Sequence, residues 1–113
     1  MENQSTTEIV RAIRYSPNLM AFGYQKLTVT GASAQALTVP TGALYAEIRV
    51  ESATTSGVIM RYLMLGATTP PTTTDGMGLS NLDFFDIPTG DNVANFRVIA
   101  VSGSHTLHIQ YYK

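Results

Sequence analysis

Two histidines, His105 and His108, are the residues best suited to metal binding or proton transfer, and both lie in one short segment, His-Thr-Leu-His. Imidazole pairs are common zinc ligands. In an extended strand, however, residues three apart point to opposite faces and lie about 10 Å apart. The spacing therefore predicts one loop histidine and one sheet-surface histidine, and no metal site.

Ser104 lies beside His105, and either Asp83 or Asp86 could complete a serine-histidine-aspartate triad. No nucleophile elbow or comparable context surrounds this serine, and serine is frequent in turns. The two aspartates are three apart, so a strand would turn them to opposite faces, away from the single cleft that paired acid–base carboxylates need. We predict that the chain has no catalytic residues and is not an enzyme.

Oxygen ligands occur together at Asp91, Asn92 and Asn95. Their spacing does not match a calcium-binding loop, and all three residue types favour turns. The chain has no cysteine, which excludes disulfides, zinc-thiolate sites and cysteine nucleophiles. We therefore expect neither a metal nor another cofactor.

The six tyrosines are the remaining candidates for binding. Aromatic rings on a sheet face can stack on sugars, although more often they pack across strands or in interfaces. Tyr45, Tyr62 and Tyr112 are the candidates for sugar contact, with Tyr45 and Tyr112 expected on solvent-facing sides of their strands. An interface role is favoured over sugar binding.

Apolar residues recur with a period of two in the segments that carry these residues. Residues 44–51 read LYAEIRVE, which predicts a strand that buries Leu44, Ala46, Ile48 and Val50. Near the C-terminus, the same alternation buries Leu107, Ile109 and Tyr111. We expect Ala46, Ile48, Val50, Val98, Leu107 and Ile109 to share one core.

Other strands are expected at 24–30, 34–39 and 82–87, and at the more continuously apolar runs 58–65 and 96–101. Turn residues, including Pro88 to Asp91, separate nearly all of them. Roughly seven or eight short strands at this spacing indicate an all-β, antiparallel β-sandwich or jelly roll. The sandwich domain is expected to span residues 22–113.

The overall composition limits the possible partners. Charged residues make up 13% of the chain, against about 25% in a typical domain, and the net charge is −1. Without a basic patch, nucleic-acid binding is not expected. No apolar run approaches the roughly 18 residues of a membrane span, and the first residues carry no secretory signal, which predicts a protein made in a cytoplasm. Low charge favours association between copies.

Residues 1–21 are expected to form an N-terminal arm or helical turn, because Ser5 and Glu8 fit a capping box and Pro17 would end the helix. Such a turn is too short to be stable alone, so it must dock on its own sandwich or on a neighbouring subunit. The threonine- and proline-rich loop within 63–80 is also expected to make a surface contact. The candidate partner interface comprises Ile9, Ile13, Leu19, Met20, Phe22, Pro70 and Pro71.

Three stretches carry a resemblance to a known group of proteins: LTVPTGALYAEIRVES (37–52), VIMRYLMLGATTPPTTTDGMGL (58–79) and NFRVIAVSGSHTLHIQYYK (95–113). Their order resembles small β-sandwich structural proteins of tailed-bacteriophage virions, over roughly residues 24–113. The resemblance implies a virion protein, most simply a capsid decoration (cement) protein that forms a homotrimer and binds the major capsid protein. A head-fibre or tail adaptor protein and a carbohydrate-binding module are the alternatives.

Overall fold

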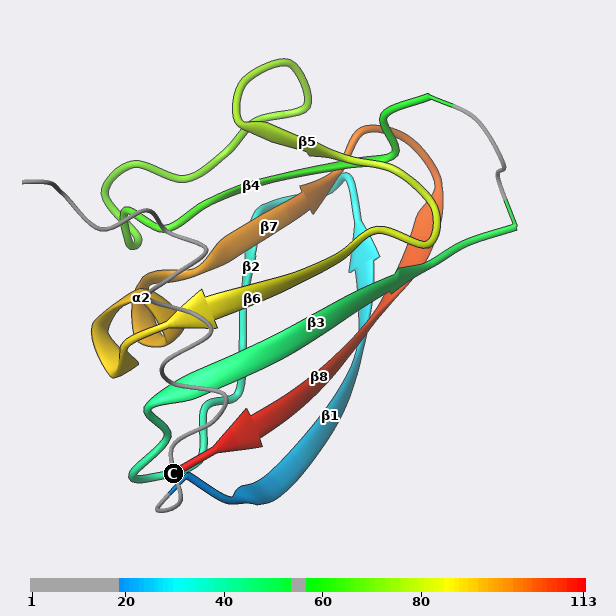
Figure 1. Ribbon diagram of the computed structural model, residues 1–113. Coiled ribbons are helices and arrows are strands. Elements are labelled where there is room, and N and C mark those ends of the chain that lie inside the picture. Colours follow the sequence, from blue (N-terminus) through cyan, green and yellow to red (C-terminus); the bar gives the residue numbers. More distant parts are fainter. Residues whose placement is uncertain (1–18, 54–56) are drawn as a thin grey trace, which may run out of the picture.

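Two antiparallel four-stranded sheets pack face to face in the computed structural model, which describes residues 19–53 and 57–113 (Figure 1). Within these ranges a single short helix accompanies eight strands. The elements are β1 (Ala21–Thr30), β2 (Gln35–Ala36), β3 (Tyr45–Glu51), β4 (Met60–Leu63), β5 (Met77–Leu79), β6 (Phe84–Pro88), α2 (Gly90–Asn95), β7 (Arg97–Ala100) and β8 (Ser104–Tyr112). The predicted all-β antiparallel sandwich is confirmed.

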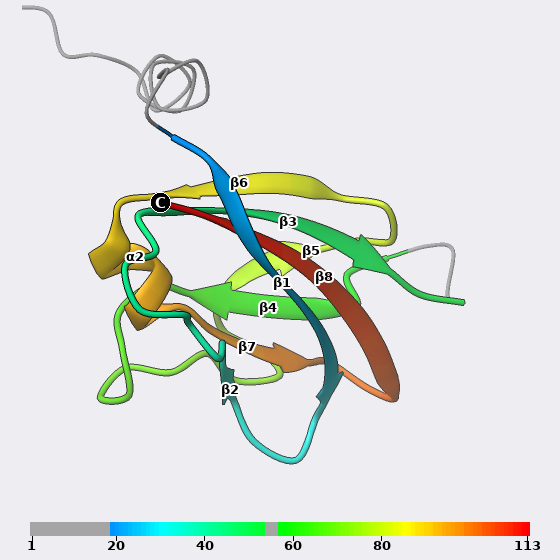
Figure 2. The same cartoon turned by 90° about the horizontal axis from the view of Figure 1, so that it is seen from below.

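The first sheet has the strand order β1-β8-β3-β6, and the second sheet has the order β2-β7-β4-β5. Figure 2 shows the two sheets as separate layers, with α2 at one end of the sandwich. The long strand β8 pairs with β1 on one side and with β3 on the other. The first sheet is therefore built around the C-terminal segment of the chain.

The core lies between the sheets and contains the residues expected from the alternation. Ile48, Val50, Leu107 and Ile109 of the first sheet are all fully buried, as is Val98 of the second. Ala46 belongs to the same apolar cluster. The predicted core and the register of β3 and β8 are confirmed.

The start of β3 departs from its predicted pattern. Tyr45 was expected to face solvent, but it is only 1% exposed, and its ring centroid lies 5.0 Å from that of Tyr112. Tyr112 and Pro88 are its register partners on the two flanking strands, so neighbouring side chains enclose it. Leu44 was expected in the core, but it precedes the strand and is 55% exposed. Both predictions were wrong, because the alternation does not show that Tyr112 covers Tyr45 on the outer face of the sheet, nor that the strand begins after Leu44.

The segment after β6 forms a helix, although a turn was predicted there. The Thr89 hydroxyl accepts a hydrogen bond from the backbone N–H of Asn92 at 3.3 Å and caps α2. Val93 is fully buried and anchors the helix to the core. A Cβ on Gly90 would lie 2.9 Å from the carbonyl oxygen of Ala43, so the close approach requires glycine. Such a short helix depends on this packing, since isolated helices of its length are unstable.

The threonine- and proline-rich loop joins β4 to β5 and folds back on its own hairpin. Arg61 of β4 donates a hydrogen bond to the carbonyl oxygen of Gly76 at 3.1 Å, and the Thr72 hydroxyl accepts one from the backbone N–H of Asp75 at 3.0 Å. Pro71 is buried, whereas Pro70 is exposed. Much of this loop therefore contacts its own chain, and its contact with a partner stays a prediction.

Both described ends meet at one end of the sandwich, where β1 starts beside the C-terminus (Figure 1). The backbone N–H of Met20 donates to the carbonyl of Lys113 at 2.9 Å, and the reverse bond measures 3.0 Å. Phe22 packs against the core, and Leu19 is half-buried. Ile9 and Ile13 lie outside the described residues.

No helix in the described part of the chain is long and apolar enough to cross a membrane.

Candidate functional site

The outer face of the first sheet gathers polar and aromatic side chains that point away from the core. Two neighbouring rows run across its four strands, because each strand contributes one outward side chain to each row. One row contains Lys26, His108, Arg49 and Phe84, and the other contains Tyr24, Gln110, Glu47 and Asp86. This face is the richest collection of functional groups among the described residues.

A groove of about 200 Å³ lies on this face, and we call it the sheet-face groove. Its lining comes from all four strands and comprises Tyr24, Glu47, Ile48, Arg49, Phe84, His108, Ile109 and Gln110. The side chains of the two isoleucines are buried in the core, so only their backbone lies beneath the groove. The walls are therefore aromatic and polar.

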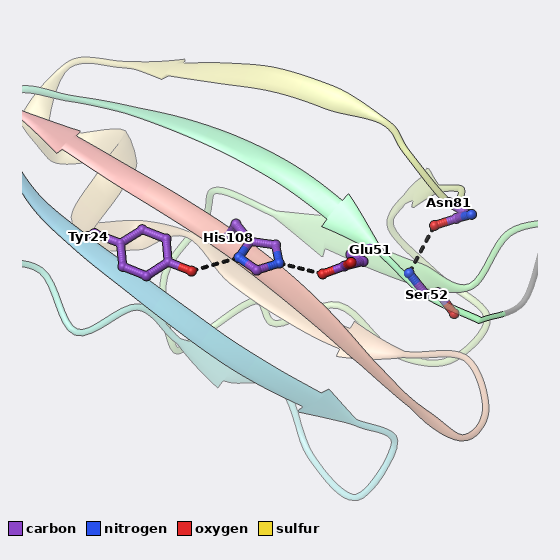
Figure 3. Close-up of polar contacts among 5 residues, drawn as sticks. All are labelled: Tyr24, Glu51, Ser52, Asn81 and His108. Carbon is purple, nitrogen blue, oxygen red and sulfur yellow. Dashed lines mark hydrogen bonds and ion pairs between the residues drawn. The ribbon is translucent and has the colours of Figure 1, made fainter.

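On one side of the groove, a chain of hydrogen bonds links side chains from β1, β8 and β3 and fixes their positions (Figure 3). The Tyr24 hydroxyl lies 2.7 Å from His108 Nδ1, and His108 Nε2 lies 2.6 Å from Glu51 Oε1. A carboxylate only accepts hydrogen bonds, so Nε2 carries the proton toward Glu51. If the imidazole is neutral, Nδ1 then accepts from the tyrosine hydroxyl. The hydrogen bond from His108 lowers the pKa of the Glu51 carboxyl below its usual value.

The other side of the groove has its own ordered groups. The Tyr112 hydroxyl donates to Glu47 Oε1 at 2.6 Å, and the Gln110 amide donates to the Tyr112 hydroxyl at 3.1 Å. The Arg49 guanidinium lies over the Phe84 ring, 5.1 Å from its centroid. This arrangement presents hydrogen-bond donors, acceptors and flat apolar surfaces together, which suits reversible binding of a ligand.

His105 lies elsewhere and has an unexpected partner. It is part of β8, it is only 7% exposed, and its Nδ1 lies 2.6 Å from the Ser52 hydroxyl oxygen. Its Nε2 lies 2.7 Å from the carbonyl oxygen of Ser102, so Nε2 donates and Nδ1 accepts from the serine. The expectation of a loop histidine was wrong. Sequence reasoning missed this pair because its members are 53 residues apart.

A serine hydrogen-bonded to histidine is one requirement of a nucleophilic site. Here the pair joins the end of β3 to the β7–β8 turn, and Asn81 accepts a hydrogen bond from the Ser52 backbone N–H at 2.8 Å (Figure 3). These contacts satisfy the polar groups of a nearly buried histidine. We assign the pair a structural role, and the absence of catalysis stays a prediction.

The acidic residues considered for catalysis or calcium are dispersed over separate elements. Asp83 accepts a hydrogen bond from the Ser80 backbone N–H at 2.7 Å, in the turn before β6, whereas Asp86 lies on that strand. Asp91 and Asn92 are in the first turn of α2, and Asn95 is its last residue. No group of three or more histidine, cysteine or acidic side chains within the described ranges could hold a metal ion.

The tyrosines considered as candidates for sugar contact are mostly engaged in packing. Tyr62 is half-buried, and its ring stacks on Phe85 at 4.9 Å and on Phe96 at 5.4 Å between centroids. Burial also raises the pKa of Tyr62. Tyr45 is enclosed as well, so only Tyr112 lies on the sheet face. The exposed rings are instead Tyr24, at 64%, and Phe84, at 45%.

Comparison with known proteins adds no relative from which a role could be transferred. No family model, curated protein or solved structure matches this chain. Its function must therefore be inferred from its own residues and their arrangement.

Proposed function

We propose that this protein is a structural component of a bacteriophage virion, a decoration protein that binds the assembled head shell and stabilises it. The proposal starts from the resemblance of residues 24–113 to small virion β-proteins. That resemblance implies a sandwich fold, and the two packed sheets agree with this implication.

The strand order is the observation that carries the proposal. Consecutive strands lie in different sheets at every step except from β4 to β5. With eight strands in the orders β1-β8-β3-β6 and β2-β7-β4-β5, we infer a jelly roll, an architecture found in viral capsid and lectin domains. A fold by itself does not decide function, so the proposal needs the resemblance and the strand order together.

An apolar rim supports attachment at the end of the sandwich where β1 begins. Met20 is 64% exposed and Leu44 is 55% exposed. Both flank the end of β8, because Met20 pairs with Lys113 and the Leu44 backbone N–H donates to the carbonyl of Tyr112 at 2.8 Å. Burying such side chains against another chain contributes about 1.5–3 kcal/mol each before ordering costs. The arm and this rim would form one continuous contact with the shell.

Quantitative mass spectrometry of purified particles encoded by the same genome tests the proposal. A decoration protein should appear at a high, fixed ratio to the major capsid protein. A few copies per particle would favour the alternative of a head-fibre or tail adaptor protein. Absence of the protein from purified particles would contradict both.

A further inference from the structure

We propose that the sheet-face groove binds a neutral sugar ring. This site is independent of attachment to a particle, because it lies on the outer face of the first sheet and uses none of the residues of the apolar rim. The argument rests on the aromatic walls of the groove, its ordered polar groups, its charge and its size.

The two exposed rings come from opposite edges of the first sheet and lean toward its centre. Tyr24 of edge strand β1 reaches His108 of β8 through its hydroxyl at 2.7 Å. Phe84 of edge strand β6 contacts Arg49 of β3, with the guanidinium 5.1 Å from the ring centroid. Both rings line the groove. The C–H faces of a sugar are flat and apolar, and such aromatic side chains can cover them.

The polar groups of the groove match the hydroxyls of a sugar, each of which donates and accepts. Arg49 only donates, Glu47 as a carboxylate only accepts, and the Gln110 amide does both. Glu47 and Gln110 are already oriented through Tyr112, and His108 is held between Tyr24 and Glu51. Groups fixed before binding lose less conformational entropy when the ligand arrives.

The charges on this face favour a neutral ligand. The permanent cations of Lys26 and Arg49 stand on the same face as the carboxylates of Glu47, Glu51 and Asp86. Among the described residues of this face, three negative groups stand against two positive ones, which gives no net attraction for a phosphate or an acidic sugar. Nucleotides and sialylated glycans are therefore disfavoured.

The size of the groove points to a single ring. At about 200 Å³ it is smaller than typical pockets for drug-sized ligands, which measure roughly 300–1,000 Å³. One sugar ring per groove implies weak binding by a single copy. Display of many copies on one particle would convert this weak contact into firm attachment to a glycan-covered surface.

A glycan array probed with the full chain coupled to a multivalent carrier tests the proposal, with saturation-transfer NMR on methyl glycosides as the monovalent measurement. We expect neutral glycans to bind and sialylated or phosphorylated ones to fail. Tyr24→Ala should lower the affinity for the glycan about tenfold, which corresponds to about 1.4 kcal/mol, near the upper end of what one aromatic contact contributes. Because Tyr24 is largely exposed, this variant should remain folded.

Thr28→Ala is the matched control, because Thr28 is exposed on the same face of β1 but does not line the groove. It should bind as the parent does. The proposal would be overturned if no neutral glycan bound in either assay, if acidic glycans were preferred, or if Tyr24→Ala bound unchanged. Since the isolated protein is used, its presence in virions does not affect the result, and the two proposals can fail separately.

Discussion

Single side chains in this protein are fixed by partners from distant parts of the chain. His108 bonds to Tyr24, 84 residues away, and His105 bonds to Ser52, 53 residues away. Tyr111 donates a hydrogen bond to Gln25, 86 residues away, at 2.6 Å. Because these bonds link different strands, single substitutions test them directly.

Ser52→Ala should destabilise the protein, because it leaves Nδ1 of the nearly buried His105 without its hydrogen-bond partner. The expected loss is about 1–3 kcal/mol in the free energy of unfolding, measured by urea denaturation. Ser104→Ala is the control, since Ser104 is exposed and next to the same histidine in sequence. Equal stability of Ser52→Ala and the parent would show that this bond does not support the fold.

Tyr111 should make the protein sensitive to alkali. Burial raises the pKa of Tyr111 from 10.0 to about 12, so its neutral form stabilises the folded state. This contribution is fully present below pH 10.0, the ordinary value, and is lost as the pH rises toward about 12. In thermal unfolding curves across this range, Tyr111→Phe should flatten the decline in stability. A decline that is equally steep in both proteins would contradict the assignment.

At the scale of elements, substitutions in strand β3 test most clearly whether successive side chains alternate between the core and the surface. Ile48 is fully buried and its neighbour Arg49 is exposed. Ile48→Ala should lower the free energy of unfolding by about 2–5 kcal/mol, because it leaves a cavity in the core. Arg49→Ala should change it by no more than about 0.5 kcal/mol. Equal effects in denaturant titrations would mean that the register of β3 is wrong.

Elements with long alternating patterns could be predicted from the sequence, and those made by tertiary contacts could not. The alternation in 44–51 and at the C-terminus located β3, β8 and the shared core. Helix α2 was missed because it depends on the buried Val93 and on the close approach at Gly90. Strand β5 was taken for loop because its three residues include Gly78 and exist only by pairing with β4.

Only part of the candidate site could be predicted from the sequence pattern. Tyr24 and Phe84 lay in predicted strands, yet their meeting on one face depends on β8 and β3 standing between β1 and β6. That strand order is set by long-range pairing, which a single sequence does not reveal. Tyr45 was assigned to the solvent-facing side because the pattern does not show that Tyr112 packs on it.

For the whole molecule, we expect association between copies, because the chain has few charges and exposes several large apolar side chains, and the resemblance to virion β-proteins implies a homotrimer. The described residues of this kind are Met20, Tyr24, Leu44, Val58, Leu65, Met77, Leu82 and Phe84. Sedimentation velocity at micromolar concentration should give three times the monomer mass of 12.2 kDa. The expectation would be contradicted if the protein were a monomer both alone and when mixed with the purified capsid protein.

The most direct test of the decoration proposal is reassembly on particles that lack this protein. The full chain should bind such particles saturably, at a fixed ratio to the major capsid protein. A chain of residues 19–113 keeps the Met20–Lys113 pairing, so its sandwich should stay folded and keep the β-sheet signal in circular dichroism, but it should bind poorly. The account would be contradicted if the full chain failed to bind, or if the truncated chain bound equally well.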